Sequence, residues 1–319
     1  MLKSLKFVQG SVAKKDFLPA LTHFVIEYGK VRGFNGVIAL CSPIPFDIAC
    51  RPKADVLIKA IANCDDTVQL NLTPAGRLSV KAGKFKAFVD CVDQETPHPL
   101  PEGEFVQFDG AALLEGLKAV EPFIGSDASR RWANGVLIRE GSLFATNNVM
   151  LVQYWVGELF KDVVNLPAVA VKEIIRINEP PLYAQVAEGN ITFHYEGDRW
   201  LRTQLYDTAA WPDLGKVLDR PSLQKPIQEE LFEALEVVKP FVGKLGTIIF
   251  NEQSITTHTD DNEGASYDVP TLIGVEGCYN ITHLELLKGT AKTIDWKGYP
   301  GPCMFENGRL RGAIIGVRA

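Results

Sequence analysis

The hexapeptides VEPFIG (residues 120–125) and VKPFVG (residues 238–243) are near copies of each other in a chain of 319 residues. Two further pairs of segments repeat in a similar order: RGFNGVIAL (32–40) with RWANGVLI (131–138), and PKADVLIKAIAN (52–63) with PAVAVKEIIRIN (167–178). Solenoid repeats have periods of roughly 20–50 residues, so spacings of this length are too long for one. They suit a whole domain instead. The sequence therefore predicts three related domains.

Each repeat reads as a strand, a helix, strands, a second helix and further strands. Apolar periodicity, as in Leu113, Leu117 and Val120, predicts first helices over about 13–28, 110–122 and 229–240. Second helices are expected at 52–63, 167–178 and 280–289. Alternating residues such as Leu78 and Val80 predict strands between glycine-bearing turns.

The expected fold class is α+β, with three repeated domains that each pack two helices on an antiparallel sheet. Proline-rich polar stretches, HPLPEG (98–103) and DRPSLQKP (219–226), are the natural linkers. They divide the chain into expected domains 1–103, 104–227 and 228–319. These carry net charges of +3, −4 and −5, which excludes a uniformly basic nucleic-acid binder but not one with a single basic face.

Composition favours a globular protein, with 46% hydrophobic and 23% charged residues. No apolar run is long enough to span a bilayer, and the N-terminus lacks the hydrophobic region of a signal peptide. We therefore expect a cytoplasmic protein with no membrane partner. The six cysteines lack C-x-x-C spacing and predict reduced thiols, most of them buried.

Signatures of catalysis are missing from the sequence. There is no G-x-S-x-G, Walker A, G-x-G-x-x-G or H-E-x-x-H pattern, and no histidine has metal-ligand spacing. The acidic stretch TDDNEG (259–264) lacks the spacing of a calcium loop and predicts a solvated turn. The sequence thus predicts a non-enzyme with no catalytic residues, no metal and no cofactor.

Cationic residues recur on or beside the expected helices of all three repeats. Diffuse positive charge without base-reading motifs suits contact with a phosphate backbone, independent of sequence. Acidic residues on the same helices moderate this field. The predicted DNA-facing residues are Lys14, Lys15, Lys53, Lys59, Lys118, Lys172, Arg176, Lys239, Lys288 and Lys292.

Three further motifs identify the family that the chain resembles. Leu205-Tyr206-Asp207 is followed by Trp211-Pro212-Asp213-Leu214 and Val217-Leu218-Asp219; Ala145-Thr146-Asn147-Asn148-Val149-Met150-Leu151 follows a strand pair; and AIIGVRA (313–319) ends the chain. In this order they resemble the DNA sliding clamps of the bacterial-type DNA polymerase III beta subunit family, over essentially the whole chain. The family's Asp-Gly-His-Arg is replaced here by Asn147 to Met150, a departure that suggests a phage-encoded or otherwise divergent clamp.

The resemblance implies a DNA polymerase processivity factor. Two chains would close head to tail into a ring around duplex DNA, without ATP or metal, and a separate clamp loader would open it. It also implies an apolar pocket that grips short peptides of the polymerase and the loader. Carried over by position, that pocket would use Thr146, Asn148, Val149, Met150, Leu151, Pro212, Lys216, Val217, Ala313 and Ile315.

Three alternatives remain at this point. The first is a clamp-fold scaffold that binds peptides without encircling DNA. The second is an enzyme that uses a cysteine or histidine of one domain, and the third is a two-domain clamp of the eukaryotic type. The threefold repeat argues against the last.

Overall fold

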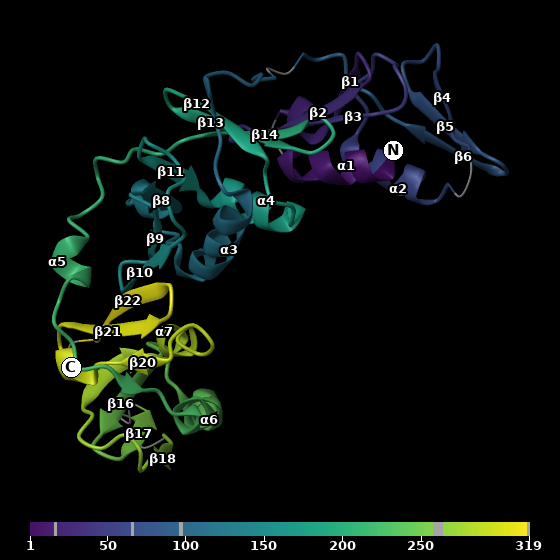
Figure 1. Ribbon diagram of the computed structural model, residues 1–319. Helices are drawn as coiled ribbons and strands as arrows, with labels where there is room; N and C mark the ends of the chain where they lie inside the picture. The colour runs from purple at the N-terminus through teal and green to yellow at the C-terminus, as the bar shows by residue number, and fades with distance from the viewer. Residues whose placement is uncertain (16–17, 65–66, 96–97, 258–263, 318–319) are drawn as a thin grey trace. The chain divides into compact units, whose positions relative to one another are not determined.

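The computed structural model describes residues 1–15, 18–64, 67–95, 98–257 and 264–317 (Figure 1). The chain divides into two compact units: Met1–Leu114 with Val169–Leu205, and Glu115–Ala168 with Tyr206–Ala319. The division falls inside one helix, α3 (Gly110–Val120). Most of the predicted acidic turn lies outside the described residues. Among those described, no helix is long and apolar enough to cross a membrane.

Unit 1 contains two antiparallel sheets in the described part of the chain. The larger has the order β1 (Val25–Glu27), β2 (Lys30–Phe34), β3 (Ile38–Pro43), β14 (Arg199–Gln204), β13 (Asn190–Tyr195), β12 (Tyr183–Ala187) and β7 (Glu104–Val106). The smaller has the order β4 (Gln69–Leu72), β5 (Leu78–Ala82) and β6 (Phe85–Val89). Trp200 of β14 pairs with Cys41 of β3. The larger sheet therefore joins strands from the first and second predicted domains.

Helices cover one face of the strands in unit 1 (Figure 1). α1 (Leu2–Val8) packs on β2, β3 and α2 (Ala54–Ala62). In α2 the residues Leu57, Ile58 and Ile61 recur at helical spacing and are buried. This confirms the second helix expected at 52–63, and α4 (Ala168–Ile177) confirms the one expected at 167–178.

An ion pair between the exposed Arg176 and the buried Glu173 fastens the N-terminal segment to α4. Arg176 donates two hydrogen bonds to the carboxylate of Glu173, which is 5% exposed, and a third to the backbone oxygen of Phe7 at 2.8 Å. A Cβ at Gly10 would lie 2.0 Å from the Glu173 carboxyl group, so only glycine allows this approach. The pair is a bidentate arrangement of the kind that arginine favours.

Unit 2 also contains two antiparallel sheets among its described residues. The larger has the order β11 (Val164–Pro167), β8 (Gly135–Arg139), β9 (Ser142–Thr146), β10 (Met150–Trp155), β22 (Leu310–Ile315), β21 (Pro302–Asn307), β20 (Thr293–Ile294) and β15 (Lys225–Pro226). The smaller has the order β18 (Ser266–Asp268), β17 (Ser254–Thr257), β16 (Thr247–Asn251) and β19 (Gly277–Asn280). α6 (Glu229–Val238) packs on β17 and β18, and α7 (Ile281–Glu285) on β19 (Figure 1).

The helical expectations are largely confirmed. α3 and α6 cover the ranges predicted at 110–122 and 229–240, each continued by a short 3₁₀ turn at the proline, and α7 falls within 280–289. The helix predicted at 13–28 is wrong. Pro19 opens a 3₁₀ turn (Pro19–Thr22), and Val25 and Ile26, which are β-branched, enter β1. Lys14 and Lys15 therefore lie in a bend. The domain boundaries stay a prediction.

Partial burial predicts how stability changes with pH. Desolvation lowers the pKa of His98, His194 and His283 below the ordinary 6.5, and Arg32 lowers that of His98 further. These rings bind protons more readily in the unfolded chain, so stability is present above about pH 6.5 and is lost as pH falls through it. The urea midpoint should drop between about pH 7.5 and pH 5.5. Replacing all three histidines by glutamine should flatten this dependence; an unchanged slope would contradict the assignment.

Candidate functional site

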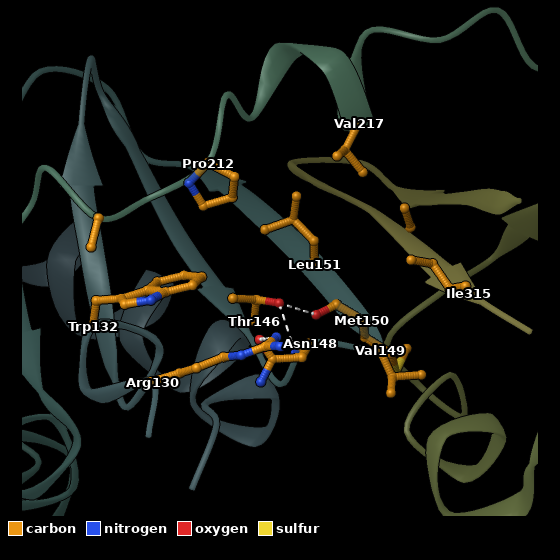
Figure 2. A pocket seen from close by; sticks show the side chains of 12 residues that line it. Arg130, Trp132, Thr146, Asn148, Val149, Met150, Leu151, Pro212, Val217 and Ile315 are labelled. Atoms are coloured by element: carbon orange, nitrogen blue, oxygen red, sulfur yellow. Dashed lines mark hydrogen bonds between the residues drawn. The ribbon is translucent and has the colours of Figure 1, made fainter. Parts of the chain in front are cut away.

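A pocket of about 310 Å³ opens in unit 2, where the turn between β9 and β10, the strand β22 and the segment leading into α5 (Gly215–Leu218) meet (Figure 2). The register of β10 with β22 pairs Leu151 with Ala313 and so brings the end of the chain to the middle strands. The lining residues are Arg130, Trp132, Thr146, Asn148, Val149, Met150, Leu151, Ala210, Pro212, Val217, Ala313 and Ile315. All belong to one compact unit.

Side chains of the β9–β10 turn hold its backbone in shape. Thr146 Oγ1 donates to the Met150 oxygen at 2.7 Å and accepts from the Asn148 amide at 3.1 Å. Asn147 Oδ1 accepts from the amides of Val149 and Met150. Asn148 has a φ of 71°, a left-handed conformation that asparagine tolerates better than most residues. The pair of asparagines therefore builds the turn on which the pocket rests.

The floor of the pocket continues into the hydrophobic core. Leu151 and Ala313 line the pocket and also belong to a buried cluster that comprises Leu137, Phe144, Leu151, Leu214, Leu218, Met304 and Ala313. Trp211 and Val217 pack against this cluster from the segment around α5. Leu218 thus plugs the core, whereas the neighbouring Val217 both packs on it and faces the cavity, as Figure 2 shows.

One wall of the pocket is cationic and aromatic. Arg130 Nη1 donates to Asn148 Oδ1 at 2.8 Å, and Trp132 lies beside it in Figure 2. The Trp132 and Trp211 rings meet edge to face, with centroids 5.1 Å apart. The lining carries a guanidinium and, among the described residues, no carboxylate. The pocket is thus suited to an apolar ligand that bears a polar or anionic group at the Arg130 side.

The predicted pocket residues converge, with one exception. All line the cavity except Lys216, which points to solvent and forms an ion pair with Asp213 at 3.6 Å. Sequence reasoning missed Arg130, Trp132 and Ala210. The signal for the first two was their position at the start of the repeated segment RWANGVLI (131–138), which contains Trp132 and follows Arg130, but that segment was used only to detect the repeat.

The predicted DNA-facing residues divide into groups. Lys14, Lys53 and Arg176 line a second cavity, of about 650 Å³, in unit 1, although the Arg176 charge is engaged by Glu173. Three others form ion pairs: Lys59 with Asp55, Lys239 with Glu285 and Lys288 with Glu236. Lys15, Lys118, Lys172 and Lys292 are exposed. That all ten face one surface stays a prediction.

Solved structures similar to this chain share one architecture. A DNA polymerase III subunit beta of Bartonella birtlesii, bound to griselimycin, has a TM-score of 0.84 at 18% identity. A sliding clamp of Bacillus subtilis has a TM-score of 0.82 at 13% identity, and a beta clamp of Helicobacter pylori, bound to a DNA ligase peptide, 0.80 at 15%. Each match covers 100% of this chain and 97% of the other.

The chain has the fold of a bacterial DNA sliding clamp. No family model matches the sequence, and no curated protein matches it either. At identities of this order the likeness concerns the fold, and it confirms the resemblance predicted from the order of motifs. The sliding-clamp fold is therefore kept here by a sequence that has diverged strongly from those of the solved clamps.

The threonine of the turn should contribute more to stability than another buried threonine elsewhere in the chain. Thr146→Val removes one hydrogen bond to Met150 and one from Asn148, and should lower the free energy of unfolding by about 1–3 kcal/mol. Thr192→Val is the matched control, because the buried Thr192 hydroxyl has no hydrogen-bond partner among the described residues. Urea denaturation measures both. Equal losses in the two variants would argue against the role given to Thr146.

Proposed function

We propose that this protein is a DNA polymerase processivity factor, a sliding clamp that encircles duplex DNA and tethers the replicative polymerase. One observation carries the proposal: a chain with the clamp fold over its full length has an apolar pocket built by the segments that the family resemblance selected. The proposed protein is not an enzyme. It confines DNA instead of transforming it.

The pocket is proposed to bind short peptide segments of the polymerase and the clamp loader. Its small apolar cavity with a polar rim is what a linear peptide needs, since an aliphatic or aromatic side chain can enter while the backbone stays at the rim. Two solved clamps with this fold contain griselimycin and another a DNA ligase peptide. Griselimycin is therefore a suitable probe for the pocket of this chain.

Ring closure is proposed to occur between two copies, head to tail. Among the described residues, neither β4 nor β6 pairs with a further strand, and the same holds for β18 and β19, so each unit presents open sheet edges. The strands of the β4–β6 sheet carry Lys81 and Lys86, and the turns that join them carry Arg77 and Lys84, whereas α6 carries Glu229, Glu230, Glu233 and Glu236. Opposite charges of this kind steer association.

The register of the basic sheet supports an anionic partner for it. Lys81 lies directly opposite Lys86 on the neighbouring strand. Like charges in such cross-strand pairs destabilise an isolated sheet, and an approaching acidic surface relieves the repulsion. Exposed Phe88 lies between Arg77 and Lys86, with their charged groups 5.1 and 4.8 Å from the ring centre.

DNA is proposed to be held by confinement and weak phosphate contacts. Exposed lysines suit contacts that carry no sequence information. Lys14 and Lys53 are the best-placed candidates, because both are exposed and both line the cavity of unit 1. Such a clamp slides freely because topology, and not affinity, retains it.

The main alternative is a clamp-fold scaffold that binds peptides but does not encircle DNA. The ion pairs of Lys239 with Glu285 and Lys288 with Glu236 favour it, because they neutralise two of the expected DNA contacts, one just after α6 and one just after α7. The two functions differ in one property: an encircling clamp is retained only on DNA without free ends, whereas the retention of a scaffold does not depend on DNA ends.

The ring predicts retention on circular DNA. In sedimentation experiments the purified protein should behave as a dimer, a species of twice the chain mass of 35.2 kDa. Once loaded, it should stay on nicked circular DNA during gel filtration and leave when the circle is linearised. Lys81→Glu combined with Lys86→Glu should dissociate the dimer and abolish retention. Equal retention on circular and linear DNA would favour the scaffold that does not encircle DNA. So would a wild-type protein that sediments as a monomer.

The pocket predicts a selective loss of probe binding. Val217→Glu places a carboxylate at the apolar cavity and should weaken binding of labelled griselimycin by at least about tenfold, measured by fluorescence anisotropy. Val163→Glu is the control, because Val163 is an exposed valine of the same unit that does not line this pocket. If both variants bind like the wild type, the pocket is not the binding site.

A further inference from the structure

A buried asparagine lies behind the pocket. Asn165 is 0% exposed and belongs to β11, where its neighbours Val164 and Leu166 are also buried. A fully buried amide in an apolar strand costs stability unless its hydrogen bonds are made. The bonds that Asn165 makes therefore indicate why a polar residue is present.

The side-chain amide joins two separate loops. Asn165 Nδ2 donates to the backbone oxygen of Trp132 at 3.0 Å and to that of Asp207 at 3.1 Å. In addition, the backbone oxygen of Asn165 accepts from the amide of Tyr206 at 2.9 Å. One residue thus fixes the spacing between the segment around Trp132 and the segment that begins at Tyr206.

These two segments form facing parts of the pocket. The first supplies Arg130 and Trp132, and the second supplies Ala210 and Pro212. They also meet directly through the edge-to-face contact of Trp132 with Trp211, at an interplanar angle of 63°. The hydrogen bonds of Asn165 and this aromatic contact act on the same pair of loops, from the core side and from the pocket side.

We propose that Asn165 is a positioning residue for the pocket: by holding two loops through one amide, it sets the distance between the Trp132 wall and the Pro212 wall. This rests on the proposed function, in which the pocket grips peptides. The side chain touches no ligand. It acts by limiting the conformations of both walls before binding, so that less ordering is needed when a peptide enters.

The test replaces the amide by a hydrocarbon of similar size. Asn165→Leu leaves the carbonyl oxygens of Trp132 and Asp207 without the donor that they share, so the two loops are no longer tied to each other. Affinity for labelled griselimycin should fall by roughly tenfold, because the two walls must then be ordered at the moment of binding. The near-ultraviolet circular dichroism of the ligand-free protein should also change in the band due to the tryptophan pair, identified as the band that Trp132→Phe removes.

Asn190→Leu is the matched control. Asn190 is also a buried strand asparagine, 7% exposed, but it lies in unit 1 and donates to Glu102. It should lose comparable stability while keeping the tryptophan band and the griselimycin affinity. Asn165→Ser, whose short side chain cannot reach both carbonyl oxygens, serves if the leucine variant does not fold.

The outcomes separate this inference from the proposed function. If wild-type protein does not bind griselimycin, the proposed peptide site fails, while the tryptophan band still decides whether Asn165 positions the loops. An unchanged band and unchanged affinity in a folded Asn165 variant would overturn the inference. So would global unfolding of both Asn165 variants, which would make the residue a general determinant of the fold.

Discussion

The antiparallel pairing of β10 with β22 is the constraint on which the candidate site depends. It joins strands from the second and third repeats, more than a hundred residues apart in the sequence, and aligns Leu151 with Ala313. A shift of one residue would turn every side chain of β22 to the other face. Gly312 protects the register, because a Cβ there would lie 2.4 Å from the Phe305 ring. The pairing of β3 with β14 makes the equivalent connection in unit 1.

Sequence reasoning succeeded where the pattern was local and repeated. The helices at 110–122 and 229–240 were predictable because their apolar spacing and terminal prolines agree. The stretch from 13 to 28 misled because Leu18, Leu21 and Phe24 mimic helical spacing, whereas the pairing of Ile26 with Cys50 comes from a distant segment. Such long-range partners leave little trace in a single sequence.

In the pocket, too, the residues that belong to local motifs could be predicted, and those positioned by long-range contacts could not. The turn after β9 and the segment around Val217 could be placed from the order of motifs, and both line the cavity. Trp132 and Ala210 escaped because their positions depend on a buried amide in β11, whose role becomes visible only when its two acceptors are known. Lys216 does not line the cavity, because in a helix of four residues the adjacent Val217 turns inward while Lys216 turns to solvent, and its part in the site stays a prediction.

The location of every lining residue within one compact unit has a consequence for dosage in the cell. A pocket complete in a single chain does not require an assembled ring in order to be occupied. Under the proposed function, surplus chains that never reach a chromosome would still compete for the same short peptide segments as the loaded ones. The proposal then implies two opposing demands on the abundance of this protein, enough copies to supply replication forks and few enough to avoid sequestering the enzymes that work there.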